Sequence, residues 1–166
     1  MKFELEQQLV QKYPSIFREY GGDPKATCMA FGIECNSGWF DLIDTLCNFI
    51  EGQVGWINAY EPTAKFGVVA AQVKEKYGTL NFYCDYVYAT DLPPEVMRRV
   101  DDTINFISGA IILANRMSGT ICESCGAKGS IDQDCTWLMC RCPECSRKEG
   151  INGKTHKQED APCGAD

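Results

Sequence analysis

The stretch CESCGAKGSIDQDCTWLMCRCPEC, residues 122–145, decides how the C-terminal part of the chain folds. It carries two Cys-x-x-Cys pairs, Cys122 with Cys125 and Cys142 with Cys145, at the separation expected of a four-cysteine zinc ribbon. A two-residue gap lets both thiolates of a pair point at one ion, and two pairs complete a tetrahedron. The pattern therefore predicts one structural Zn²⁺ ion held by these four cysteines.

The ligand set has two rivals within the same stretch. Cys140 lies two residues before Cys142, and Cys135 lies between the pairs, so either could replace a predicted ligand. Cys142 is favoured because Cys-x-x-Cys is the common geometry. Two thioredoxin-type dithiols are the alternative, but such sites use a single motif between a strand and a helix. Four sulfur ligands leave no position for water or substrate, which makes the predicted metal structural.

Residues 128–134 and 135–139 are expected to form a hairpin between the two cysteine pairs. This segment has too few apolar residues for a core of its own, so metal binding would supply its folding energy. Trp137 either packs the ribbon onto the rest of the chain or stands out as an anchor for a partner. Packing is the favoured interpretation.

Helical patterns occur at three places before the cysteine pairs. Residues 2–12 are good helix formers that end before Pro14, and residues 39–50 carry apolar side chains at helical spacing. A third helix should run from about residue 93 to residue 118. Its middle, Ile107 to Leu113, is apolar nearly all round and is expected to cross the core.

An alternating pattern predicts a β-hairpin between the second and third helices. Apolar and polar residues alternate over residues 66–76 and again over 80–85, and Tyr77-Gly78-Thr79 supplies the turn. Residues 13–38 are expected to form mainly loop, because they are rich in turn-forming residues, and a short strand around residues 28–33 is the alternative.

The predicted fold is therefore α+β, with three helices packed on a small antiparallel sheet, the hairpin at about 66–86, and a zinc ribbon after it. The expected parts are a body over 1–119, a ribbon over 120–147 and a polar tail over 148–166.

Composition indicates a soluble chain of the cytoplasm. Hydrophobic residues make up 45% and charged residues 23%, and no apolar run is long enough to cross a bilayer. The N-terminus lacks the features of a signal peptide, so the eleven cysteines are expected to be reduced or metal-bound. The formal net charge of −7 disfavours nucleic acid as a partner and favours a basic protein.

Catalytic patterns are missing from the sequence. His156 is the only histidine and lies in the polar tail, which argues against a histidine-based acid or a Ser/His/Asp triad. The carboxylate pairs Asp41/Asp44 and Asp101/Asp102 are typical of solvated helix faces, and no phosphate-binding glycine motif is present. We therefore expect that the chain is not an enzyme.

A basic and aromatic spot is a second candidate for ligand or partner contact. Lys74 and Lys76 share one strand face and lie near Tyr77 and Tyr83 in the predicted hairpin. Such a spot could bind an anionic ligand or single-stranded nucleic acid, with Arg98 and Arg99 nearby. A solvated strand face is the favoured interpretation.

Three stretches together resemble a known family. They are GWFDLI at residues 38–43, AQVKEKYGTLNFY at 71–83, and ICESCG at 121–126 with Trp137 and the second cysteine pair. In this order they resemble a family of short uncharacterised proteins of phages, prophages and bacteria that end in a four-cysteine zinc ribbon. The resemblance implies the architecture and a phage-type context, hence the host cytoplasm, but names no active residue. Cys135, Cys140 and the acidic tail depart from the family pattern.

These observations favour a non-enzymatic zinc-binding interaction protein. In a phage-type context, it would act through protein–protein contacts with a host protein, as an inhibitor of a defence or nucleic-acid-processing complex. The alternatives are a nucleic-acid-associated zinc-ribbon module and a binder of a small anionic signalling nucleotide.

Overall fold

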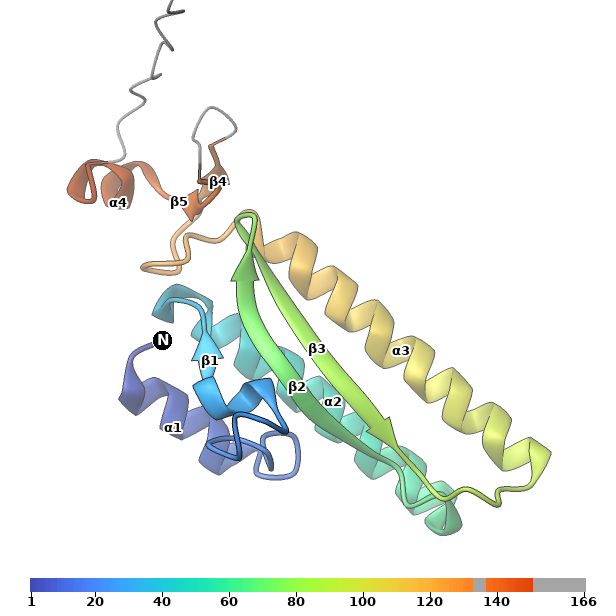
Figure 1. Cartoon of the computed structure of the whole chain (residues 1–166). Helices are drawn as coiled ribbons and strands as arrows, with labels where there is room; N and C mark the ends of the chain where they lie inside the picture. Colours follow the sequence, from blue (N-terminus) through green and yellow to red (C-terminus); the bar gives the residue numbers. More distant parts are fainter. Residues whose placement is uncertain (133–136, 151–166) are drawn as a thin grey trace, which may run out of the picture.

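A computed structural model describes residues 1–132 and 137–150 of the chain (Figure 1). The fold is mixed α+β, with a three-stranded sheet, a separate two-stranded sheet and a C-terminal cluster of cysteines. Cys135, His156 and the predicted tail beyond residue 150 lie outside the described residues. The division into body, ribbon and tail stays a prediction.

The predicted hairpin is confirmed as β2 (Gly67–Lys76) and β3 (Thr79–Val87), which pair antiparallel. Tyr77 and Gly78 both have positive φ angles, 56° and 78°, as a two-residue type I′ turn requires. The side chain of Glu75 accepts a hydrogen bond from the backbone N–H of Gly78 and so closes this turn. A register shift between Ala70 and Gln72 marks a β-bulge in the middle of β2.

The sheet is not purely antiparallel, which corrects the prediction. β1 (Ile33–Glu34) pairs parallel to β2, with Ile33 opposite Val73. Parallel neighbours need a crossover connection, and helix α2 (Phe40–Tyr60) supplies it between β1 and β2. A two-residue strand shows no alternation, so its direction could not be read from the sequence. The buried carboxylate of Glu6 accepts a hydrogen bond from the Ile33 N–H and holds this edge in place.

The helices of the body are α1 (Phe3–Lys12), α2 and α3 (Pro94–Ser118). Helix α2 continues to Tyr60, well beyond the predicted end at residue 50. Gly52 and Gly55, which are poor helix formers, weaken the sequence signal there. In Figure 1, α2 and α3 lie on one side of the long hairpin and α1 lies beyond β1. Three short 3₁₀ helices connect the elements: η1 (Cys28–Phe31), η2 (Ser37–Trp39) and η3 (Pro62–Ala64).

The core lies between the sheet and the helices. It contains fully buried large side chains from every part of the body, among them Leu9, Phe17, Trp39, Ile43, Ile50, Ile57, Val73, Leu80 and Ile107. Each contributes about 1.5–3 kcal/mol relative to an exposed position. Helix α1 is joined to α2 by Asp44, which accepts hydrogen bonds from the hydroxyl of Tyr13 at 2.9 Å and from Nζ of Lys12 at 2.7 Å.

Helix α3 does not cross the core, contrary to the prediction. Ile107 is fully buried, but Phe106 is 66% exposed and Leu113 is 59% exposed. An all-round apolar helix segment is buried only where both of its sides are covered. Here the sheet and α2 cover one side of α3, and no described residue of the chain covers the other.

Candidate metal centre

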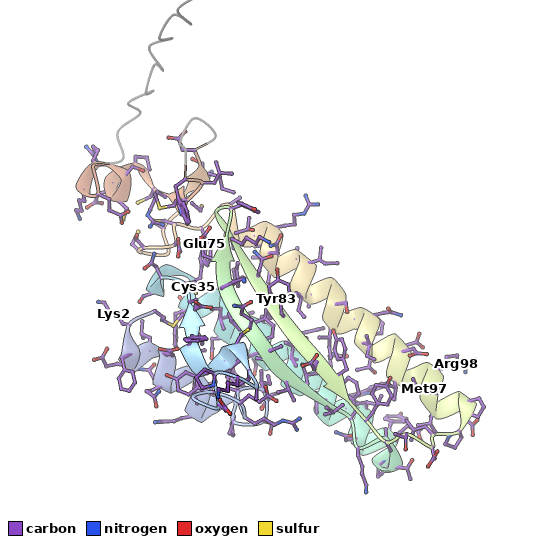
Figure 2. The ribbon with its side chains drawn as sticks, in the orientation of Figure 1. Lys2, Cys35, Glu75, Tyr83, Met97 and Arg98 are labelled. Carbon is purple, nitrogen blue, oxygen red and sulfur yellow. The ribbon has the colours of Figure 1, made fainter. Side chains whose placement is uncertain are left out.

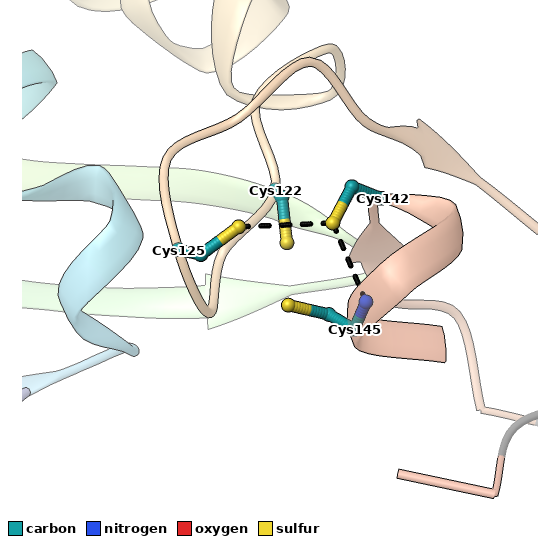
Figure 3. A group of neighbouring side chains, drawn as sticks. All are labelled: Cys122, Cys125, Cys142 and Cys145. Carbon is teal, nitrogen blue, oxygen red and sulfur yellow. Dashed lines mark hydrogen bonds between the residues drawn. The ribbon is translucent and has the colours of Figure 1, made fainter. Parts of the chain in front are cut away.

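The four predicted cysteines come together at the end of the molecule where the hairpin turns (Figures 1 and 3). Cys122 and Cys125 lie in a turn just after α3, and Cys142 and Cys145 lie at the start of the short helix α4 (Pro143–Lys148). The two-stranded sheet between them pairs β4 (Ser130–Ile131) with β5 (Cys140–Arg141). Residues 133–136 of the predicted hairpin lie outside the described residues, and the described second strand begins at Cys140.

The sulfur geometry fits one tetrahedral metal ion. The four Sγ atoms all lie within 4.8 Å of one another, and those of Cys125 and Cys142 are 3.7 Å apart. Zn–S bonds of about 2.3 Å in a tetrahedron would place neighbouring sulfurs about 3.8 Å apart. The thiols are therefore close enough together to hold one metal ion, and zinc is the ion that a closed site of four thiolates most commonly binds.

The backbone shapes the first pair into a knuckle. The N–H of Cys122 donates to the carbonyl of Ala127 at 2.7 Å, and the N–H of Gly126 donates to the carbonyl of Cys122 at 2.8 Å. Gly126 has a φ of 78°, which glycine adopts without strain. The turn therefore presents both sulfurs on one side.

The second pair has an electrostatic asymmetry. The backbone N–H of Cys145 points at Sγ of Cys142 at 3.4 Å and is the main reason that the pKa of Cys142 falls to about 7. Hydrogen bonding with Cys125, and then with Cys142, raises the pKa of Cys145 to about 12. One thiolate thus forms readily. Ionisation of the neighbouring thiols is opposed by repulsion between negative charges unless a cation compensates them.

Cys140 is not part of the sulfur cluster. Its side chain is fully buried in the hydrophobic core, where burial raises the pKa of the thiol to about 11. Cys140 lies in β5, whereas Cys142 lies after the strand as the N-cap of α4, so the two cysteines belong to different elements and only Cys142 joins the cluster. Cys135, the other rival ligand, lies outside the described residues.

A buried ionic network surrounds the cysteines, and sequence reasoning missed it. Arg141 forms ion pairs with Glu123 at 2.9 Å and with Glu149 at 2.8 Å, and Ser124 donates a hydrogen bond to Glu149 at 2.7 Å. These contacts connect the first knuckle, strand β5 and the end of α4. The only sequence signals were Glu123 inside the first cysteine pair and Arg141 directly before the second.

The segment that follows α3 and carries the four cysteines, residues 119–132 and 137–150, is called the metal module below. It is attached to the body through residues that precede α2. The backbone N–H of Gly38 donates to the carbonyl of Glu123 at 2.7 Å, and the indole N–H of Trp39 donates to the carbonyl of Ile121 at 2.8 Å. The Glu123 carboxylate also accepts from the N–H of Asn36. Trp39 is fully buried, whereas Trp137 is 69% exposed. The tryptophan that packs the module onto the body is therefore Trp39, and the favoured interpretation of Trp137 was wrong.

The basic and aromatic spot is present on the hairpin. Nζ of Lys74 lies 5.9 Å from the ring centre of Tyr83, and Nζ of Lys76 lies 5.4 Å from that of Tyr77. Both tyrosines are exposed. Glu34 is paired opposite Lys74 in the neighbouring strand, which reduces the positive potential there.

The two arginines expected near this spot lie elsewhere. Figure 2 shows Arg98 at the far end of α3 from Tyr83, near the start of that helix. Arg99, next in sequence, forms an ion pair with Glu61. The hairpin turn instead faces the other end of α3, where Ser118 accepts a hydrogen bond from the N–H of Leu80.

A hollow of about 730 Å³, lined by both polar and apolar residues and called the mixed hollow below, lies between the segment after α1 and the open end of the hairpin. Arg18 and Lys65 line it and could attract an anion, but Glu51 lines it too. The hollow therefore gives no clear charge preference for an anionic nucleotide.

A scan against protein-family models and searches of curated proteins and of solved structures found no match. The structure and its cysteine cluster define a class, an α+β protein with four C-terminal cysteines that could hold a metal ion. The likeness to phage and bacterial proteins rests on the sequence patterns alone. None of the described helices has the length and hydropathy to span a bilayer.

Proposed function

We propose that the chain is a non-enzymatic, zinc-stabilised interaction protein. The observation that carries this proposal is the closed set of four thiols, which leaves no coordination position for substrate. Zinc would fix the positions of the two knuckles and of the short sheet between them. Its role would be to shape a binding surface, and the chain would act by occupying a surface of another protein.

Exposed aromatic side chains on and beside the module support a protein partner. Trp137 stands out from the module, and Tyr77 stands out from the hairpin turn. The turn and the module meet directly, because Gly78 lies against the side chain of Ile131. Exposed tryptophan and tyrosine are the side chains that most often anchor protein–protein contacts.

Charge favours a basic target. The chain has a formal charge of −7, and one Zn²⁺ held by four thiolates would add about two further negative charges. An acidic protein of this kind could compete with nucleic acid for a basic surface of a host defence or nucleic-acid-processing complex. In the phage-type context, the chain would be an inhibitor in the host cytoplasm.

The test is affinity capture from the host cell with the zinc-loaded chain and two variants, Trp137→Ala and Phe3→Ala. Phe3 is similarly exposed but lies on α1, whereas Trp137 belongs to the segment between the two cysteine pairs. We expect a partner that the Trp137→Ala variant loses and the Phe3→Ala variant keeps. Capture of no partner by the native chain, or equal capture by all three proteins, would contradict the proposal.

A nucleic-acid-associated module is the second candidate, favoured by the two lysine–tyrosine pairs on the hairpin. Stacking of bases on exposed tyrosines next to lysines is a common mode of single-strand binding. Filter binding of a labelled single strand at increasing salt separates the candidates, because phosphate contacts predict a steep loss of affinity. Binding that is absent at low salt would eliminate this candidate.

A further inference from the structure

An open apolar groove runs between α2 and α3, on the side of these helices that the sheet does not cover. Its volume is about 580 Å³, and the N-terminal half of α2 and the C-terminal half of α3 form its walls. The main apolar lining residues are Leu42, Leu46, Phe49, Phe106, Leu113 and Met117. The groove shares no lining residue with the mixed hollow beside the hairpin, and none of the four cysteines lines it, although Ile121, the residue before Cys122, does.

The lining side chains repeat at helical spacing. Phe106, Leu113 and Met117 follow one another along one stripe of α3, and all three are exposed. Gly109 and Ala110 lie between them in the lining, and their small side chains leave the space of the groove open. Exposed apolar surface that is contiguous in this way is typical of binding sites in small soluble proteins.

The dimensions of the groove suit a helix. The wall from Asp41 to Phe49 and the wall from Phe106 to Met117 correspond to helix lengths of roughly 12 and 17 Å at 1.5 Å per residue. A third helix laid along two antiparallel helices would contact α2 over about two turns and α3 over about three. Binding of an amphipathic helix in an apolar groove is a common mode of peptide recognition.

Charge decides between the candidate occupants. Among the residues that line the groove, Asp41 alone is charged, and it lies exposed at one end. A second copy of this chain would bring another formal charge of −7 to the contact. The chain's own residues 151–166 contain a single large apolar residue, Ile151, which is too few for a groove with several apolar positions.

We propose that this groove binds an amphipathic helix of a partner protein, with apolar side chains on one face and lysine or arginine beside them. The apolar face fills the space between Phe49, Phe106 and Leu113, and a basic side chain at the end of the helix pairs with Asp41. This inference rests on the proposed function only in that both make the chain a protein-binding one, and the groove is a surface separate from Trp137.

The test uses a synthetic helical peptide of about 14 residues, with leucine at i, i+4, i+7 and i+11 and lysine beside them. A second peptide has the same leucines and glutamate in place of lysine. Fluorescence anisotropy at physiological salt measures both against the zinc-loaded full chain. We expect the lysine peptide to bind with a Kd below about 100 μM and the glutamate peptide to bind about tenfold more weakly or not at all.

Three variants locate the binding. Leu113→Glu places a carboxylate in the groove and should weaken the lysine peptide about tenfold. Ile112→Glu is the matched control, because Ile112 is its exposed neighbour on α3 but does not line the groove, and it should bind as the native chain does. Asp41→Lys should shift the preference toward the glutamate peptide. Circular dichroism verifies that each variant is folded.

Several outcomes would overturn the inference. They are no binding of the lysine peptide, equal binding of both peptides, or equal weakening by Leu113→Glu and Ile112→Glu. Sedimentation that shows a dimer dispersed by Leu113→Glu would assign the groove to a second copy and would also reject the proposal. The Trp137→Ala capture experiment is unaffected by these results, so the two proposals can fail separately.

Discussion

The guanidinium of Arg141 lies 2.9 Å from the carboxylate of Glu123, and these side chains are only 8% and 5% exposed. The pair joins strand β5 to the first knuckle and thus connects the two halves of the metal site independently of any metal. The second oxygen of the same carboxylate accepts a hydrogen bond from the N–H of Asn36, in the body. Glu123 is therefore the residue through which the metal module, its ionic network and the body are joined.

Replacing one partner of this buried pair should be strongly destabilising. Glu123→Gln leaves the charge of Arg141 without its most buried partner, and such a loss costs about 3–5 kcal/mol. Thermal or urea unfolding of the zinc-loaded chain measures the effect. The control is Lys148→Met, which removes the exposed ion pair with Glu144 and should leave the unfolding midpoint unchanged. Similar midpoints for Glu123→Gln and the native chain would show that the network contributes little.

Metal removal should unfold the C-terminal module. We expect one zinc per chain in protein purified under reducing conditions, and a lower unfolding temperature after treatment with a chelator. Cys145→Ser should abolish stoichiometric zinc. Cys28→Ser is the matched control, because Cys28 is an exposed free cysteine of the body, and this variant should bind zinc normally. Loss of zinc in both variants, or in neither, would contradict the assigned ligands.

Zinc binding should also release protons. The pKa of Cys142 is lowered to about 7, whereas that of Cys145 is raised to about 12 and that of Cys125 is also raised, so Cys145 and Cys125 carry their protons at neutral pH without metal. These protons must leave when zinc binds, so the affinity for zinc falls as the pH decreases. Calorimetry in two buffers of different ionisation enthalpy should show release of roughly two or more protons per ion. Identical enthalpies in both buffers would refute this prediction.

The contact of Asp44 with α1 should make the free energy of unfolding depend on pH in the acidic range. Hydrogen bonds from Lys12, the larger effect, and from Tyr13 lower the pKa of Asp44 from its ordinary 3.8. A lowered pKa in the folded state means that the contribution is complete above pH 3.8 and is lost as the pH falls through the folded value.

The measurement compares urea unfolding of the native chain and of Asp44→Asn at several pH values. Their difference in unfolding free energy should shrink as the pH falls below about 4, and effects of metal release are common to both proteins. Tyr13→Phe should cost about 1 kcal/mol at neutral pH, because it removes one partly buried hydrogen bond. A pH-independent difference would exclude Asp44 as the source.

Two glycines should respond in opposite directions to alanine. A methyl group at Gly38 would overlap the carbonyl oxygens of Cys122 and Glu123, so Gly38→Ala should displace the first knuckle and weaken zinc binding. Gly52 lies in the exposed middle of α2 with open space around it. Gly52→Ala should therefore raise stability by about 1 kcal/mol and leave zinc binding unchanged. Competition with a coloured zinc chelator and urea unfolding measure the two effects.

Local spacing made several features predictable from the sequence. The two cysteine pairs, the hairpin around Tyr77-Gly78 and the presence of three body helices follow from short-range periodicity and turn chemistry, which depend on few neighbours. The end of α2 was misplaced because Gly52 and Gly55 weaken the local helix signal, although packing of Ile57 in the core keeps the helix intact.

Taken alone, the sequence determined which residue types recur at which spacing, and hence the four cysteines of the cluster and the hairpin. Only the tertiary structure decided that Cys140 points into the core, that β1 runs parallel to β2, that Trp39 and not Trp137 joins the module to the body, and that Phe106 and Leu113 remain exposed on α3. The reason is physical: spacing places a side chain on a strand face or helix stripe, but whether that face is covered depends on segments far away in the chain.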